Sequence, residues 1–204
     1  MSFYERRVLP KLINFACGLG PMMKQRAKVV PLATGNVLEI GIGSGLNLSY
    51  YQKDKVKSLI GIDPSIETWA LNKNLTEELG FEFTYFETGA EKLPIDNQSI
   101  DTVVITYTLC TIPNANLAFE EIRRVLKPNG KILFVEHGKA PDAQVLKWQN
   151  RINPYWKKIG GGCNLNRDIP QIFSANGFKI PDLKTMYLPG WKPASFNFWG
   201  IAEW

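Results

Sequence analysis

The chain has 204 residues, of which 45% are hydrophobic and 21% are charged. This composition is typical of a folded globular protein, and the length suits one α/β domain. The formal net charge of +5 comes from 24 basic residues scattered along the chain, with no basic block. Such scatter argues against a nucleic-acid-binding protein and leaves only a weak preference for anionic partners.

The N-terminal 30 residues have the pattern of a helical arm. Apolar residues recur at helical spacing before Gly18, and a second short helix is expected over residues 22–29. Lys11 interrupts the apolar stretch that follows Arg6 and Arg7, which argues against a signal peptide. The longest uncharged run, residues 12–23, is shorter than the ~20 residues that span a bilayer. The arm either packs on the domain or, as a basic amphipathic segment, makes peripheral contact with a membrane.

From residue 36 onward, short apolar runs alternate with helical patterns. The expected strands are residues 36–41, 58–62, 82–86, 102–107 and 131–136, and the expected helices are 46–52, 66–79, 116–126 and 169–175. Strands that alternate with helices pair in parallel through right-handed crossovers, which predicts a doubly wound sheet. Residues 178–188 and 195–203 are aromatic-rich and extended, so the end of the chain is expected to be antiparallel.

A glycine-rich turn follows the first predicted strand. Gly41, Gly43 and Gly45 stand where an apolar run ends, and such a turn needs permissive φ angles and close approach of the backbone to a ligand. The dinucleotide fingerprint G-x-G-x-x-G would need glycine at position 46, where this chain has Leu46. A nicotinamide-binding site is therefore disfavoured.

The second predicted strand ends in an acid. Asp63 and Pro64 follow residues 59–62, and Asp63 lies eighteen residues after Gly45. In folds of this kind, an acid near that distance accepts hydrogen bonds from the ribose hydroxyls of an adenosine ligand. The alternative is that Asp63 only caps the next helix, a role that Ser65 could share. The glycine turn and the acid together favour an adenosine site.

Four motifs follow one another along the chain, at residues 38–45, 61–65, 89–101 and 126–131. In this order they resemble the class I S-adenosylmethionine-dependent methyltransferases, in the branch that includes ubiquinone, menaquinone, phospholipid and thiol methyltransferases. The resemblance implies a Rossmann-like α/β fold with a doubly wound, mostly parallel seven-stranded sheet and an antiparallel C-terminal edge. It also implies one domain over residues 1–204, with an arm (1–30), a cofactor-binding core (31–137) and a substrate-side region with the C-terminal strands (138–204).

The same resemblance implies S-adenosyl-L-methionine as cofactor and gives roles to matching positions. The glycines would hold its methionine part, Glu39 would orient their loop, and Asp63 would bind the ribose. Ala90 and Glu91 would contact the adenine edge, although Gly89 stands where many relatives carry an aspartate. The predicted cofactor-binding residues are Glu39, Gly41, Gly43, Gly45, Asp63, Pro64, Ala90, Glu91 and Thr106.

Residues 153–156 and 160–168 are similar to the corresponding part of the thiol methyltransferases, with a glycine–cysteine pair at Cys163 and an arginine–acid pair at Arg167. A shared fold does not carry the acceptor with it, so thiols, quinone precursors and phospholipid amines stay open as small, apolar acceptors. The three cysteines, Cys17, Cys110 and Cys163, lie far apart in the sequence and lack the close pairing of zinc motifs. They favour a reducing, cytoplasmic setting, and we expect a packed Cys163 and no metal site.

Methyl transfer from a sulfonium mainly requires positioning and exclusion of water, and a base is needed only where the acceptor must lose a proton. His137, the only histidine, follows the fifth predicted strand at the edge where ligands bind. We predict it as the catalytic base, the alternative being a histidine that merely ends the strand. Aromatic residues are expected to wall an apolar pocket: Tyr107, Trp148, Tyr155, Trp156 and Trp191.

Three other functions compete with a small-molecule methyltransferase. A nicotinamide-dependent reductase is disfavoured by Leu46 and by the lack of a Tyr-x-x-x-Lys pair in a plausible helix. A nucleic-acid methyltransferase would carry an Asn-Pro-Pro-Tyr type of motif after the fourth strand, which is missing here. A protein that binds S-adenosylmethionine without turnover, at a membrane surface or on a partner, stays open. The sequence assigns no oligomeric state.

Overall fold

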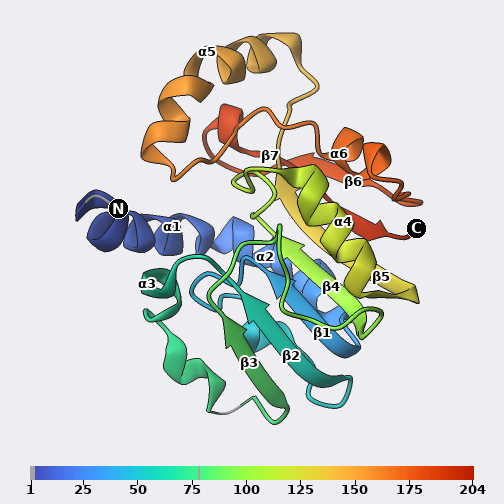
Figure 1. Cartoon of the computed structure of the whole chain (residues 1–204). Helices are drawn as coiled ribbons and strands as arrows, with labels where there is room; N and C mark the ends of the chain where they lie inside the picture. Colours follow the sequence, from blue (N-terminus) through green and yellow to red (C-terminus); the bar gives the residue numbers. More distant parts are fainter. Residues whose placement is uncertain (1–2, 78) are drawn as a thin grey trace.

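The computed structural model of the protein describes residues 3–77 and 79–204 and is built around one seven-stranded sheet (Figure 1). The strands are β1 (Gly35–Ile40), β2 (Val56–Ile62), β3 (Glu82–Phe86), β4 (Ile100–Thr106), β5 (Leu126–His137), β6 (Lys184–Tyr187) and β7 (Phe196–Ala202). Their order across the sheet is β3-β2-β1-β4-β5-β7-β6. The first five strands pair in parallel, and β7 is antiparallel to both β5 and β6. The predicted sheet, with its antiparallel C-terminal edge, is confirmed.

The strand order reverses at β1, which lies between β2 and β4. The chain leaves β1 toward β2 and β3 on one side and returns through β4 and β5 on the other. In open α/β sheets, ligands bind in the crevice at the carboxyl ends of the strands where this reversal occurs. The topology therefore predicts a ligand site at the carboxyl ends of β1, β2 and β4.

Helices cover both faces of the sheet (Figure 1). They are α1 (Leu9–Cys17), α2 (Gly20–Val29), α3 (Ile66–Trp69), α4 (Ala115–Val125), α5 (Ala143–Ile159) and α6 (Ile169–Ala175). Within the described residues, none of them is both long and apolar enough to cross a bilayer.

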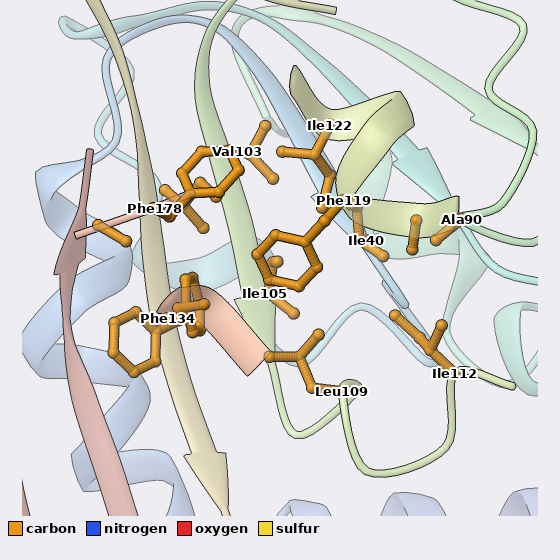
Figure 2. Packing of buried hydrophobic residues seen from close by; sticks show 14 of the residues in the cluster. Ile40, Ala90, Val103, Ile105, Leu109, Ile112, Phe119, Ile122, Phe134 and Phe178 are labelled. Carbon is orange, nitrogen blue, oxygen red and sulfur yellow. The ribbon is translucent and has the colours of Figure 1, made fainter. Parts of the chain in front are cut away.

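Alternate residues of each central strand enter two separate cores. On β4, Val103 and Ile105 belong to the core beneath α4 and α6, whereas Val104 belongs to the core beneath α2. Figure 2 shows the first of these, where Phe119 and Ile122 of α4 lie over Val103 and Ile105. Because neighbouring side chains on a strand point to opposite faces, strands buried on both sides read as continuous apolar runs. These runs made the central strands recognisable in the sequence.

Two predicted helices are wrong or too long. Residues 46–52 form only a 3₁₀ turn at Leu48–Tyr50, because this segment is rich in Asn, Ser and Tyr, which are poor helix formers. The helix expected over residues 66–79 ends at Trp69 and continues as a 3₁₀ turn at Lys73–Thr76; its residue 78 lies outside the described chain. Trp69 stacks on Tyr85 with ring centroids 5.1 Å apart, which anchors α3 to the sheet.

One long helix was not predicted. α5 has 17 residues and Pro154 inside it, and of its side chains only Gln149 is buried. An interior proline and a mostly exposed surface hide the helical period in the sequence. Gln149 donates to the carbonyls of Gly138 and Leu165 at 2.9 Å each, so this buried amide attaches α5 to the domain.

Candidate functional site

A cavity of about 450 Å³ opens at the carboxyl ends of β1, β2 and β4. Its floor is the glycine turn after β1 and the first residues after β2. Its roof is α1, whose contributing side chains are Leu9, Pro10, Ile13, Asn14 and Cys17. A volume of this size lies within the range of small-molecule and cofactor sites. The N-terminal arm is therefore part of the site, which its helical pattern alone did not indicate.

The glycine turn brings backbone groups to the cavity. Gly41 has φ +70°, and a Cβ at this position would overlap the Thr108 side chain. Gly43 has φ +54° and no atom nearer than 3.8 Å to the place of a Cβ, so its surroundings are open. A side chain is thus excluded at Gly41 by packing, and both positions need the left-handed backbone that glycine adopts readily.

Asp63 joins the glycine turn to the end of β2. Its Oδ2 accepts from the Gly43 N–H at 3.0 Å, and its Oδ1 accepts from the Ser65 N–H at 2.8 Å. Burial raises the pKa of Asp63, although these two backbone hydrogen bonds act in the opposite direction. The helix cap itself belongs to Ser65, whose Oγ accepts from the Thr68 N–H. Asp63 thus lines the cavity in a role other than capping.

Beneath the turn, a buried network surrounds Glu39. Tyr51 donates to Oε2 at 2.7 Å, and the Asn47 amide donates to Oε1 at 2.8 Å. Asn47 also donates to Thr106 Oγ1 at 2.9 Å, which joins the ends of β1 and β4. Burial raises the pKa of Glu39 to about 7, against the opposing effects of the Tyr51 and Asn47 hydrogen bonds and of the Arg26 charge.

Arg26, on α2, brings a buried cation to the cavity wall. Its Nη1 donates to Asn47 Oδ1 at 2.9 Å and to Thr106 Oγ1 at 2.5 Å. Only 5% of Arg26 is exposed, its Nε has no partner, and it forms no ion pair with a carboxylate of the described residues. A buried charge is costly without a compensating group, so this position suits an anionic ligand. Arg26 was not among the predicted site residues, because one arginine in a basic arm carries no local signal in the sequence.

Tyr107, just after β4, is held in an uncommon backbone conformation with φ 55°. Its hydroxyl donates to Asn197 at 2.7 Å, and Arg26 lies over its ring at 5.1 Å from the centroid. Bulky residues with positive φ persist where the surroundings enforce them, often at functional sites. Of the five aromatic residues expected to wall the pocket, only Tyr107 does so. Trp156 lies outside the lining, as do Trp148, Tyr155 and Trp191, which are more than half exposed.

The structure places seven of the nine predicted cofactor residues on the cavity wall: Gly41, Gly43, Asp63, Pro64, Ala90, Glu91 and Thr106. Glu39 lies beneath this wall in the buried network, and Gly45 packs on Leu48. Glu91 accepts from the Asn114 N–H at 3.2 Å, which ties its loop to the start of α4. Leu46, at the position of the missing third fingerprint glycine, also lines the cavity.

His137, the predicted base, lies outside the cavity lining. It is 8% exposed, and its Nε2 lies 3.3 Å from Cys163 Sγ. Burial lowers the pKa of His137, but the Cys163 sulfur outweighs this and the net shift is upward. A hydrogen bond from Cys110, together with the charge of His137, lowers the pKa of Cys163 against the effect of burial. The role of His137 as a catalytic base stays a prediction.

Known proteins resemble the chain in sequence and in structure. Residues 38–134 match the family described as "Methyltransferase domain". The chain is 30% identical to the thiol S-methyltransferase TMT1B of Rattus norvegicus over 165 residues, which cover 79% of this chain and 65% of that protein. It is 32% identical to the phosphatidylethanolamine N-methyltransferase of Cereibacter sphaeroides over 118 residues, which cover 55% of this chain and 57% of that protein.

The solved structures agree on the fold. The putative methyltransferase of Haloferax volcanii, solved with the Trm112 activator, superposes with a TM-score of 0.71 over 98% of this chain and 96% of that chain, at 17% identity. The sequence motifs, the sheet and these relatives agree. Residues 38–134 therefore carry a methyltransferase domain, in a chain with the fold of the class I S-adenosylmethionine-dependent methyltransferases. The chain spans less than two thirds of the thiol S-methyltransferase TMT1B proteins of rat and human, 65% and 57% of their lengths respectively.

The buried Glu39 makes the stability of this methyltransferase depend on pH. Its pKa is about 7 in the folded chain and near 4.5 without the fold, so the native state holds the extra proton between these values. The contribution of Glu39 to the free energy of unfolding therefore falls as pH rises through this window and is constant above it. Glu39→Gln carries no such dependence. Relative to the wild type, the variant should gain up to about 3 kcal/mol from pH 4.5 to 7.

Urea unfolding of both proteins at several pH values across this window measures the effect. Comparing the two cancels groups that titrate alike in both, Glu136 among them. A difference in the free energy of unfolding that does not change with pH would show that the carboxylate is solvated in the folded protein.

Proposed function

We propose that this protein binds S-adenosyl-L-methionine in the cavity beneath α1 and transfers its methyl group to the sulfur of a small apolar thiol. When bound, the cofactor supplies an electrophilic methyl group on a sulfonium. The sulfonium S–CH₃ bond breaks as the acceptor S–CH₃ bond forms, and the thiol proton leaves to solvent. The observation that carries the proposal is that the carboxylate of Asp63 and the buried guanidinium of Arg26 both line one cavity.

The lining residues fit the two ends of the cofactor. Asp63 retains lone pairs for two ribose hydroxyls while it holds the glycine turn. Arg26, held by Asn47 and Thr106, faces the same cavity and would pair with the methionine carboxylate. Pro64 and Ala90 provide apolar surface for the adenine between them. The guanidinium thus matches the charge of an amino-acid carboxylate, and the Asp63 carboxylate matches the hydrogen-bond donors of a ribose.

A thiol is the acceptor class that this lining supports best. The lining near α1 includes Leu9, Ile13 and Ile112, which exclude water from an apolar acceptor. The lining of the described chain contains no histidine. A thiol with a pKa near ~8.5 supplies some thiolate at neutral pH without a base, whereas a phenol or a ring carbon needs one. The resemblance of residues 160–168 to the thiol methyltransferases supports the same choice.

Substitutions of Arg26 and Asp63 test the two ends of the proposed cofactor site independently. Arg26→Gln should weaken binding of S-adenosylhomocysteine by about 10- to 100-fold, the value of a hydrogen bond to a charged group. It should leave 5′-methylthioadenosine, which lacks the amino-acid part, unaffected. Asp63→Asn should weaken both ligands, because both contain the ribose. Isothermal titration measures the four affinities, and NAD⁺ should raise the melting temperature of none of the proteins.

Equal losses for both ligands in the Arg26→Gln protein would assign Arg26 to the fold and not to the carboxylate. Because Arg26 is buried in a network, Arg26→Lys serves as the milder variant should the glutamine protein unfold. Lysine retains the charge but not the planar, two-donor geometry, so the Arg26→Lys protein should bind S-adenosylhomocysteine more weakly than the wild type and 5′-methylthioadenosine equally well.

The acceptor is tested by supplying an alkyl thiol, a phenol and phosphatidylethanolamine in separate assays with the same cofactor, followed by mass spectrometry. The thiol should be methylated, and the phenol should react at least about 10²-fold more slowly for lack of a base. Asp63→Asn is the control for enzyme-dependent turnover. Methylation of phosphatidylethanolamine alone would overturn the thiol assignment. Binding of S-adenosylhomocysteine without any methylation would favour the non-catalytic alternative.

The outward side of α1 supports a contact with anionic lipid surfaces. Leu12 and Phe15 are 50% and 70% exposed, opposite the side that roofs the cavity. Arg6, Arg7 and Lys11 lie exposed on the same arm. Apolar side chains beside cations are the pattern of a helix that lies on a membrane surface. An apolar acceptor could then reach the cavity from the lipid phase.

Cosedimentation with vesicles tests this contact. The protein should bind phosphatidylglycerol vesicles more tightly than phosphatidylcholine vesicles, and a Leu12→Ser, Phe15→Ser protein should bind at least about tenfold more weakly. Leu117→Ser, which removes an exposed leucine from α4, is the matched control. Equal binding by the double variant and the wild type would exclude this side of α1 as a lipid contact.

A further inference from the structure

The only histidine of the chain and two of its three cysteines meet at one place. Cys110 lies in the turn after β4, His137 is the last residue of β5, and Cys163 lies in the turn after α5. Their three ligand atoms all lie within 4.8 Å of one another. Three separate elements thus bring two thiols and an imidazole together, and neither cysteine forms a disulfide.

Polar contacts hold the segments that carry these side chains. Asn164 donates to the Cys110 carbonyl through its backbone N–H at 2.9 Å and through its side chain at 2.8 Å. Arg167 donates to the carbonyls of Leu109 and Ile112 on either side of Cys110. The turn after α5 and the turn after β4 are therefore fixed against each other.

The cluster has dimensions close to those of a tetrahedral zinc site. Zn–S bonds of about 2.3 Å and Zn–N bonds of about 2.0–2.1 Å place a sulfur and a nitrogen about 3.6 Å apart, and two sulfurs about 3.8 Å apart. Here Cys163 Sγ lies 3.3 Å from His137 Nε2, and no pair of ligand atoms is separated by more than 4.8 Å. Shifts of about 1 Å or less would bring all three atoms to bonding distance of one ion.

Neither ring nitrogen of His137 forms a hydrogen bond to an oxygen atom of the described residues. Its Nε2 faces the Cys163 sulfur, and its buried Nδ1 has no hydrogen-bond partner among the described residues. The Trp156 indole N–H is also buried, and it acts on the Cys163 sulfur, where it lowers the pKa of the thiol. Buried polar groups are almost always paired, so an imidazole whose Nε2 contacts only a thiol among the described residues can bind a ligand through that nitrogen.

We propose that Cys110, His137 and Cys163 bind one Zn²⁺ ion through two thiolates and one imidazole. Two sulfurs and one nitrogen form a ligand set that zinc prefers, and three protein ligands leave a fourth coordination position for a small molecule. The site adjoins the cavity: Cys110 contacts the Tyr107 carbonyl at 3.8 Å, and Tyr107 and Thr111 line the cavity wall. Zinc binding does not depend on the identity of the methyl acceptor.

Cobalt is the spectroscopic probe for this site. The full chain, reduced, freed of metal with a chelator and carrying no histidine tag, is titrated with Co²⁺ and then with Zn²⁺. We expect one equivalent of Co²⁺ to produce thiolate-to-cobalt charge-transfer absorption and tetrahedral d–d bands, and Zn²⁺ to abolish both. Cys110→Ser, Cys163→Ser and His137→Asn should each weaken binding by at least about 100-fold, since even losing a group that only orients a ligand costs 10- to 100-fold.

Cys17→Ser is the matched control, because Cys17 is the third cysteine and lies on the cavity wall outside the cluster. It should bind the metal as the wild type does. Absence of a saturable cobalt spectrum, or equal binding by the Cys110→Ser and wild-type proteins, would overturn the proposal. So would an equal loss in the Cys17→Ser protein.

If the Cys110→Ser or His137→Asn protein fails to fold, alkylation of the wild-type protein tests the zinc site instead. Zinc should protect Cys163, the more exposed of the two ligand thiols, from iodoacetamide and leave the modification of Cys17 unchanged, as read by mass spectrometry. Equal modification of Cys163 with and without zinc would refute the site. Metal stoichiometry, spectrum and protection do not use methylation, so this test can succeed or fail independently of the proposed reaction.

Discussion

The carboxylate of Glu39 is buried at the end of β1 with both oxygens occupied, and the cavity is built above it. Tyr51 and Asn47 bind its oxygens, Asn47 reaches Thr106 on β4, and Arg26 reaches both Asn47 and Thr106. A buried acid is tolerated only when hydrogen bonds compensate for its lost hydration. This constraint joins β1, the segment after the glycine turn, β4 and α2 in one network. The raised pKa of Glu39 reflects the remaining cost of burial.

The same network explains why the N-terminal arm belongs to the proposed cofactor site. α2 carries Arg26 into the network, and α1 lies over the cavity with Asn14 Oδ1 accepting from Ser44 Oγ at 2.5 Å. The arm thus supplies a cation beneath the cavity and an apolar cover above it. In a chain whose sheet ends would otherwise face water, this cover provides the exclusion of solvent that methyl transfer needs.

The region after β5 holds the wall on the other side of the cavity in place. Gln149 fixes α5 to the domain, and Asn164 and Arg167 hold the turn after β4. That turn contributes Thr108, Thr111 and Ile112 to the cavity wall. The segment that resembles the thiol methyltransferases therefore supports the end of the cavity proposed for the acceptor and, at Cys163, the proposed metal site. Differences in this region between relatives would change the acceptor without changing how the cofactor is held.

The sequence by itself determined the parts of this protein that local physics controls. Apolar runs buried on both faces identified the central strands, Gly41 and Gly43 identified a turn that only glycine tolerates, and Asp63 stood at the right distance to join them. Periodicity failed where local preference was weak: the turn after Gly45 is not a helix, and α5 was hidden by Pro154. These failures concern segments whose conformation depends on what they pack against.

Tertiary structure alone decided which distant side chains meet. Arg26 became part of the site because α2 packs on the sheet, and Cys110, His137 and Cys163 came together because three elements end at one place. The spacing of the cysteines predicted no metal site, since ligands that come from separate elements leave no short motif in the sequence. Such contacts form only when the whole fold brings distant segments together, so no short stretch of sequence predicts them.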